Sequence, residues 1–204
     1  MDDSDLTPKQ QRSRETKRRI LDATLALLED RHFEDLTIAD IAQVAGMAVG
    51  NFYKRFKNKA DLLPHLYSEY NRRFNSFAKK IQSKPDNEPW HQIVHGVVNF
   101  FFANKGLIRA LHLHSRFNPK LVPDGNTDSR SQLYEALELL IDRPGMDSKT
   151  RKLRGRLVAV VMISTTTEAI LYPDMTPAVA SGIKKNQLIK ELALVLRSYA
   201  DQPW

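Results

Sequence analysis

The chain has 204 residues, 42% hydrophobic and 27% charged, a composition that supplies a buried core and excludes global disorder. It has no cysteine, which excludes a disulfide framework, a cysteine-based zinc finger, an iron–sulfur cluster and a cysteine nucleophile. Lys and Arg outnumber Asp and Glu by 31 to 24, and the formal net charge of +7 favours a polyanionic partner.

Residues 1–19 are polar and lack the apolar stretch of a signal peptide. The longest apolar run, residues 157–163, is far shorter than the roughly 18 residues that suggest a membrane span. We therefore expect a soluble, cytoplasmic protein with no membrane partner.

Helix-start signals recur along the chain, and no stretch shows sustained strand-like alternation. Thr7-Pro8-Lys9-Gln10 reads as a capping box with Pro at the first helical position, and predicts a helix to about Arg31. Further starts are predicted at Thr37, Asn58, Asn87-Glu88-Pro89, Thr127, Ser148 and Thr176-Pro177. The sequence therefore predicts an all-α fold of about nine helices.

The helix that begins at Asn58 is expected to be the only covalent link between an N-terminal and a C-terminal domain. Pro64 falls inside this predicted helix, where it removes the hydrogen bond to Ala60 and predicts a kink.

Residues 37–59 carry the most informative pattern. A short helix at 38–44 turns Ile38, Ile41 and Ala42 toward a core, and a second is predicted at about 48–54. Between them, Gly46 permits a tight turn because glycine adopts positive φ without a steric penalty. Two helices joined by a short glycine-containing turn form a helix-turn-helix. Small residues line the outward side of the second helix, while Phe52 and Phe56 are spaced to anchor it.

Residues 14–63, approximately, resemble the DNA-binding domain of the TetR family of bacterial repressors. The matching positions are Ile20-Leu21-Asp22-Ala23, Phe33, Thr37, Ile38, Ile41, Ala42, Ala45-Gly46, Gly50, Phe52-Tyr53, Phe56, Lys59 and Leu62-Leu63. The segment from Tyr53 to Lys59 is close to the most distinctive stretch of the family. Two positions depart from the pattern: His32 replaces a usual Gly, and Ala48 replaces a frequent Ser that caps the recognition helix.

The resemblance implies a TetR-type helix-turn-helix DNA-binding domain at residues 14–74, with the motif itself at 37–56. Residues 75–204 would then form an effector-binding and dimerisation domain. The implied function is that of a bacterial repressor, associated with the nucleoid when bound, which a small apolar or amphipathic effector releases from a pseudo-palindromic operator. Two alternatives stay open: a helix-turn-helix regulator whose second domain senses a protein partner, and an all-helical enzyme or carrier with a fortuitous pattern.

Eleven residues are expected to contact double-stranded operator DNA. By resemblance, the groove-facing positions of the recognition helix are Ala48, Val49, Gly50, Asn51 and Lys54. Phosphate contacts are implied for Thr37, Tyr53 and Lys59, and a basic approach to the backbone for Arg12, Arg14 and Arg18. Among these, Asn51 suits adenine and Lys54 suits guanine. Tyr53 is also compatible with a core-edge aromatic, Lys59 with a solvated lysine, and Arg12 and Arg14 with a solvated tail.

The aromatic-rich middle of the chain predicts where an unidentified effector binds, although a plain core role fits each residue as well. The predicted pocket residues are Phe100, Phe101, Leu111, His112, Phe117, Met162 and Thr166. His112 and His114 cannot chelate one metal ion, because side chains two apart on a helix point about 200° from each other. No catalytic motif and no metal-ligand spacing occurs, so we expect no enzyme, no cofactor and no metal.

By resemblance, the last two helices, about residues 148–171 and 177–200, build a homodimer. Their apolar stripes are long enough for both a core and a partner face. The predicted interface residues are Leu153, Leu157, Val161, Leu188, Leu192, Val195, Leu196 and Tyr199.

Overall fold

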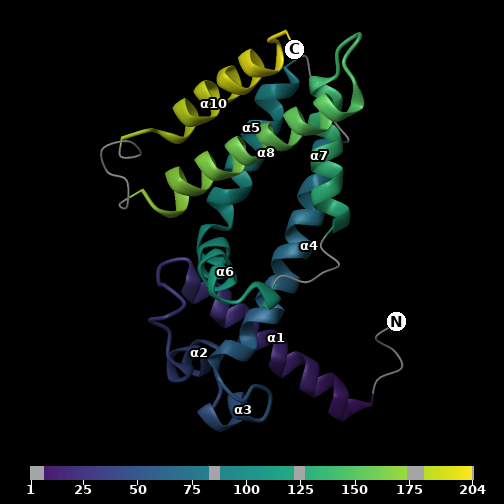
Figure 1. Ribbon diagram of the computed structural model, residues 1–204. Helices are drawn as coiled ribbons and strands as arrows, with labels where there is room; N and C mark the ends of the chain where they lie inside the picture. Colours follow the sequence, from purple (N-terminus) through teal and green to yellow (C-terminus); the bar gives the residue numbers. More distant parts are fainter. Residues whose placement is uncertain (1–6, 83–87, 122–126, 174–181, 204) are drawn as a thin grey trace. The chain divides into compact units, whose positions relative to one another are not determined.

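The computed structural model describes residues 7–82, 88–121, 127–173 and 182–203. These residues form α-helices joined by short turns, with two 3-10 helices and no strand, so the prediction of an all-α fold with about nine helices is confirmed (Figure 1). The nine α-helices of the described residues are α1 (Pro8–Leu28), α2 (Ile38–Val44), α3 (Val49–Tyr53), α4 (Leu63–Gln82), α5 (Pro89–Ala103), α6 (Lys105–Phe117), α7 (Thr127–Ile141), α8 (Ser148–Leu171) and α10 (Lys185–Ala200). The 3-10 helices are η2 (Lys59–Leu62) and η3 (Pro119–Leu121).

Several predicted helix starts are confirmed by their caps. Thr7 and Thr37 each close a reciprocal capping box, with Gln10 and Asp40 respectively. Helix α8 begins at Ser148, as predicted, and its N-cap is Asp147, whose carboxylate accepts from two backbone N–H groups. The predicted start at Thr176-Pro177 lies outside the described residues, and the described part of the last helix begins at Lys185.

The first helix ends at Leu28, three residues before the predicted end at Arg31. The backbone N–H of Glu29 already bonds to the carbonyl of Ala26, so the helix tightens into a turn there. His32, at the position where the resemblance expects Gly, needs no left-handed backbone, because every positive-φ residue in the described chain is a glycine.

The predicted kink at Pro64 is wrong. Asn58 caps a 3-10 turn, and the α-helix proper begins only at Leu63. Pro64 is thus the second residue of α4, in the first turn, where a missing N–H breaks no helical hydrogen bond.

The chain divides into two compact units, and the division is not linear. The first unit contains Met1–Tyr70 and Gly106–Val122, and the second contains Asn71–Lys105 and Pro123–Trp204. The chain therefore passes three times between the units, so the helix after Asn58 is not the single covalent link that we expected. The roles assigned to residues 14–74 and 75–204 stay predictions.

The first unit packs α1, α2, α3, the start of α4, and α6 around one core. Ile20, Ile41, Phe52 and Leu66 are fully buried there. Helix α6 adds Leu107, Ala110 and Leu111. It approaches α1 closely, because a Cβ added at Gly106 would lie 1.8 Å from the carbonyl oxygen of Leu28.

The second unit is a bundle in which α5, α7 and α10 all pack against α8, and α10 also packs along α5 (Figure 1). Its fully buried residues include Val94, Leu137, Met162 and Leu196. Within the described residues, every helix is too short or too polar to cross a lipid bilayer.

Candidate nucleic-acid interface

Helix α2 is fixed at its start by a polar network around Asp40. The Thr37 hydroxyl accepts from the Asp40 N–H at 3.0 Å, and the Asp40 carboxylate accepts from the Thr37 N–H at 2.9 Å. The same carboxylate accepts from Arg31 Nη2 at 3.0 Å. The hydrogen bonds from Thr37, together with the Arg31 guanidinium, lower the pKa of Asp40 to about 2. Thr37 is exposed, so the start of α2 lies at the surface of the first unit.

The turn between α2 and α3 depends on Gly46, which has φ of +63°. The Met47 N–H bonds to the carbonyl of Ala42, and the Gly46 N–H bonds to that of Gln43, which is the Schellman pattern of a helix end. Arg19 of α1 completes the turn: its Nη2 donates to the carbonyls of Ala45 at 2.6 Å and Gly46 at 3.1 Å. Arg19 therefore holds the turn from outside the motif.

Helix α3 turns its aromatic residue inward and its small residues outward. Phe52 has no exposed surface and contacts Phe56 and Tyr53 edge-on or tilted, which confirms its predicted role as an anchor. Ala48 and Gly50 are exposed, Val49 is 40% exposed, and no atom lies within 4 Å of a Cβ placed on Gly50. Ala48 is the N-cap and makes no side-chain cap bond, as its departure from Ser predicts.

The two expected base-reading side chains are hydrogen-bonded to each other. Lys54 Nζ donates to Asn51 Oδ1 at 3.2 Å. Asn51 is half-buried and Lys54 is exposed. The pair presents one amide and one ammonium group beside the small residues of α3.

Lys59 is held inside the first unit rather than extended into solvent. Its Nζ donates to the carbonyl oxygens of Phe33, Glu34 and Leu36 at 2.7, 2.8 and 2.7 Å. It also lies 5.0 Å from the centroid of the Phe33 ring. Partial burial lowers the pKa of Lys59, against the raising effect of Glu34 and Asp35. The ammonium thus closes the loop between α1 and α2, a role that neither of the two sequence interpretations foresaw.

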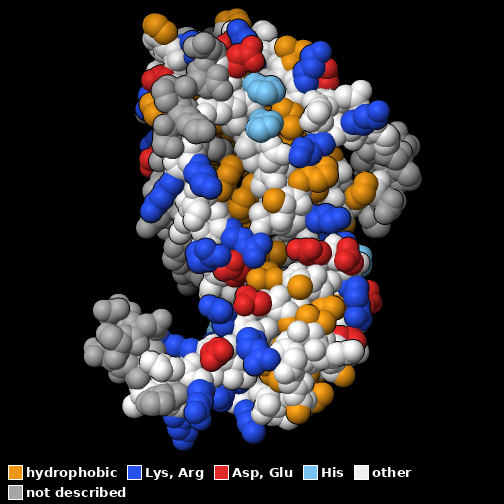
Figure 2. Space-filling view, turned by 180° about the vertical axis from the view of Figure 1, so that it is seen from behind, with side chains coloured by type: hydrophobic (Ala, Val, Ile, Leu, Met, Phe, Trp, Pro, Cys, Tyr) orange, Lys and Arg blue, Asp and Glu red, His pale blue; other side chains and the backbone are white. Residues whose placement is uncertain are grey.

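The remaining expected DNA contacts lie on the surface of the same unit. Tyr53 is 55% exposed, and Arg12 and Arg14 are exposed on the first turns of α1. Arg18, with 79% of its side chain exposed, makes a loose ion pair with Asp22 at 3.7 Å. Figure 2 shows Lys and Arg side chains gathered at the lower end of this unit.

Sequence reasoning missed the contacts that α6 makes to the loop after α1. Arg109 Nη2 donates to the carbonyl of Arg31 at 3.0 Å. His114 Nε2 lies 3.0 Å from Glu34 Oε1, and its ring meets Phe33 edge-on at 5.1 Å. These pairs are 78 and 80 positions apart in sequence, and no local pattern marks them.

The predicted effector-pocket residues are divided between the two units. Phe100, Phe101, Met162 and Thr166 are buried in the second unit. Leu111, His112 and Phe117 belong to the first unit, where Leu111 is in the core and Phe117 is 83% exposed. Thr166 Oγ1 has no hydrogen-bond partner among the described residues.

The predicted dimer residues also separate into two groups. Leu188, Leu192 and Leu196 are buried inside the second unit, at 7, 5 and 2% exposure. Val161 and Tyr199 are half-buried. Leu153, Leu157 and Val195 are 67, 45 and 56% exposed. Val160, which belongs to the predicted apolar stripe of the same helix, is 60% exposed, and sequence reasoning did not name a further exposed neighbour, Leu194.

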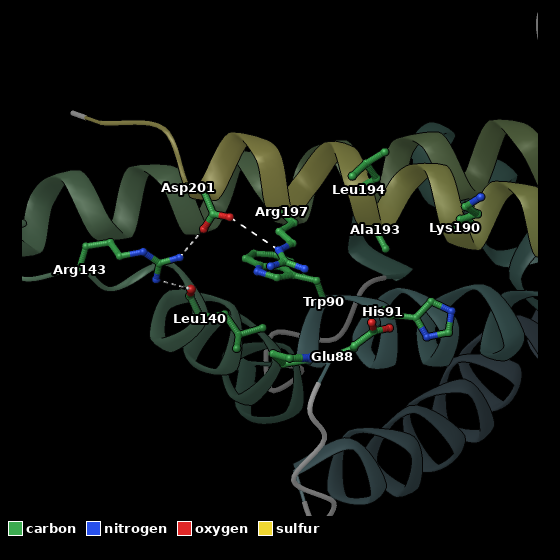
Figure 3. A pocket seen from close by; sticks show the side chains of 11 residues that line it. Glu88, Trp90, His91, Leu140, Arg143, Lys190, Ala193, Leu194, Arg197 and Asp201 are labelled. Atoms are coloured by element: carbon green, nitrogen blue, oxygen red, sulfur yellow. Dashed lines mark hydrogen bonds and ion pairs between the residues drawn. The ribbon is translucent and has the colours of Figure 1, made fainter.

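A pocket of about 550 Å³ lies between the ends of α5, α7 and α10 in the second unit (Figure 3). Trp90 forms part of its lining, and Asp201 joins two arginines across it, 2.6 Å from Arg143 Nη2 and 3.7 Å from Arg197 Nε. Two of its cationic groups, Arg143 and Arg197, therefore share one carboxylate within the pocket. No group of three potential metal ligands occurs among the described residues.

Comparison with known proteins agrees with this geometry. Residues 20–66 match the family model of the bacterial regulatory proteins of the tetR family. A putative TetR-family transcriptional regulator from Mesorhizobium loti superimposes with a TM-score of 0.65 at 17% identity, over 92% of this chain and 96% of that one. FadR of Bacillus subtilis, solved in complex with stearoyl-CoA, superimposes with a TM-score of 0.60 at 17% identity, over 90% of this chain and 98% of that one. NalD of Pseudomonas aeruginosa, the secondary repressor of the MexAB-OprM multidrug efflux pump, superimposes with a TM-score of 0.59 at 17% identity, over 95% of this chain and 100% of that one.

No curated protein matches the sequence significantly. At the identities of the solved structures, the likeness establishes a shared fold, while the sequence match concerns the helix-turn-helix region itself. The chain therefore carries the N-terminal domain of the tetR family of bacterial regulatory proteins, shares its fold with TetR-family regulators, and is a DNA-binding transcriptional regulator rather than an enzyme.

Proposed function

We propose that this regulator is a repressor that binds a pseudo-palindromic operator as a homodimer and is released by a small apolar or amphipathic effector. The observation that carries the DNA-binding part is the outward face of α3. Ala48, Val49 and Gly50 leave the helix backbone open on the side away from Phe52. Such a face enters a major groove without steric hindrance.

Phosphate and base contacts follow from what surrounds this face. Thr37, Tyr53, Arg12, Arg14 and Arg18 are exposed donors that fix the register on the backbone. Asn51 and Lys54 offer the hydrogen bonds that distinguish bases. One helix of five residues reads few base pairs, so selectivity requires two copies on two half-sites.

The exposed residues of α8 and α10 support the homodimer. Leu153, Leu157 and Val160 recur at i, i+4 and i+7 on α8, and Leu194 and Val195 lie exposed on the adjoining α10. Apolar residues grouped in this way are typical of a surface that a partner covers. We propose that these five residues form the centre of the interface, and that Leu188, Leu192 and Leu196 support it from within each subunit.

The release by an effector rests on likeness. FadR of Bacillus subtilis was solved with stearoyl-CoA, and NalD is described as a repressor. Both share the fold of this chain, which supports an effector-responsive repressor here.

The decisive experiment is footprinting of the purified protein on the DNA that flanks its own gene. We expect protection of two half-sites related by a two-fold axis, and binding that weakens steeply with salt. The variant Asn51→Ala is expected to relax discrimination at one position per half-site, by about 1–3 kcal/mol in a base-substitution series. Uniform weakening across the series would show that Asn51 only positions the helix.

A further inference from the structure

Two exposed histidines of the second unit lie about one helical turn apart on α5. His91 and His95 are separated by four positions, and residues with this spacing lie on the same face of a helix. The residues between them that enter the core, Ile93 and Val94, are buried. The second unit contains no other histidine, and Figure 2 shows two adjacent His side chains on its surface.

The two imidazole rings are already close to each other. Their centroids are 5.9 Å apart and their planes are inclined by 21°, so the rings stack. Two histidines at i and i+4 on one helix face are the arrangement with which zinc-binding helices hold an ion. Sequence reasoning weighed His112 and His114, which point apart, and did not consider this pair.

The contacts of Asn99 show which nitrogen of His95 carries a lone pair. Asn99 Nδ2 donates to the backbone carbonyl of His95 at 2.8 Å, and the same Nδ2 lies 3.0 Å from His95 Nε2. An amide nitrogen donates and does not accept, so Nε2 is the acceptor and the neutral ring has its proton on Nδ1. Nε2 is therefore the unprotonated nitrogen that a metal ion requires.

Two neutral nitrogen donors select the kind of ion. Mg²⁺ and Ca²⁺ are bound by oxygen ligands, whereas imidazole suits Ni²⁺, Cu²⁺ and Zn²⁺. The affinity of such a site rises through Ni²⁺ to Cu²⁺ and is lower again for Zn²⁺. Lys190 lines the same hollow as His91, which disfavours a cation that is attracted by charge alone.

We propose that His91 and His95 chelate one divalent transition-metal ion, and that Cu²⁺ is bound most tightly. The ion replaces the Asn99 amide proton at His95 Nε2, and water fills its remaining positions. Bound in this way, it links the first turn of α5 to the second and stabilises the second unit. The site is separate from DNA binding, because the helix-turn-helix belongs to the first unit.

The test is isothermal titration calorimetry of the full chain, without a histidine tag, in a weakly coordinating buffer. The probes are CuCl₂, NiCl₂, ZnCl₂ and MgCl₂. We expect one tight Cu²⁺ site, weaker binding of Ni²⁺ and Zn²⁺, and no binding of Mg²⁺. Electron paramagnetic resonance of the Cu²⁺ complex should show coupling to two imidazole nitrogens. Mg²⁺ binding as tight as Cu²⁺ binding would refute the chelate.

Substitution of each histidine separates chelation from binding to a single imidazole. His91→Gln and His95→Gln should each weaken Cu²⁺ binding at least about tenfold, because one ligand is lost. Both residues are exposed, so the variants should fold, which circular dichroism checks. His32→Gln is the control, because His32 is exposed and has no histidine four positions away. Wild-type affinity in either pair variant would overturn the proposal.

Asn99→Asp tests where the ion lies. A carboxylate beside His95 Nε2 offers a third ligand, so Cu²⁺ should bind at least about tenfold more tightly. Saturating Zn²⁺ should raise the midpoint of thermal unfolding of the wild type, and should leave the double variant His91→Gln, His95→Gln unchanged. An unaltered Cu²⁺ affinity in Asn99→Asp would show that the ion is not at His95 Nε2, and would refute the arrangement.

Discussion

Three backbone carbonyls surround the ammonium group of Lys59, and this arrangement changes what its removal should do. We expect Lys59→Met to lower the free energy of unfolding by about 1–3 kcal/mol, because hydrogen bonds to charged groups are lost and the carbonyls are left without their donor. Chemical denaturation of the purified variant measures this. Lys57→Met is the control, since Lys57 is exposed and is expected to unfold like the wild type.

The same variant decides between a structural and a phosphate-binding lysine. A phosphate contact would lower the slope of log K against log salt by about one. With Nζ held by the loop, we expect the slope to stay unchanged while overall affinity falls. If the variant had normal stability and its slope were lower by one, the result would show that Lys59 does contact a phosphate.

Asp40 makes the helix-turn-helix sensitive to acid in a defined direction. Its pKa is about 2 in the folded protein against an ordinary value of 3.8. The unfolded chain therefore binds the proton more readily, and the contribution of Asp40 is fully present above pH 3.8 and is lost as the pH falls toward 2. Denaturation at a series of pH values should show a weaker decline over this interval in Asp40→Asn than in the wild type. Parallel declines would mean that Asp40 does not contribute.

Two glycines on different helices should respond in opposite ways to an added methyl group. Gly106→Ala places a Cβ 1.8 Å from the Leu28 carbonyl oxygen, so α6 must move away from α1. We expect a loss of about 1–3 kcal/mol of stability, measured by thermal or chemical unfolding. An unchanged stability would indicate that the two helices are not packed as closely as described.

Gly50→Ala adds the same methyl group where nothing lies within 4 Å. Stability should be unchanged or rise by about 0.5–1 kcal/mol, because Ala favours a helix over Gly. Operator affinity should nevertheless fall, because we expect the added methyl group to collide with the DNA that the exposed face of α3 contacts. Normal affinity in a gel-shift titration would place α3 further from the groove than we propose.

We expect the proposed dimer to depend on exposed rather than buried leucines. Leu157→Asp places a charge on a surface that is 45% exposed in the isolated chain, and should yield a folded monomer by light scattering at micromolar concentration. Leu192→Asp, at 5% exposure, should instead unfold the second unit. A Leu157→Asp protein that is folded and still dimeric would show that this face is not the dimer interface.

Local signals predicted the helices well, because caps and turns act within a few residues. Thr7, Thr37, Asn58 and Gly46 were read correctly for this reason. Pro64 was misread, since a 3-10 turn delays the start of α4 and no local rule specifies that delay. The small residues of α3 were sufficient to predict its exposed face. The contacts of Lys59, Arg19 and His114 could not be predicted, because their partners lie 23 to 80 positions away in the sequence.

The return of the chain to the first unit at Gly106–Val122 limits how this protein can be cut or recombined. A fragment that ends at residue 74 lacks Leu107, Ala110 and Leu111, and so exposes the apolar residues that α6 covers. In a chimera with a single crossover at that point, α6 would come from one parent and the helices that it packs against from the other. Transplanting the operator specificity of this protein therefore calls for grafting two separate segments, or for exchanging the surface residues of α3 alone.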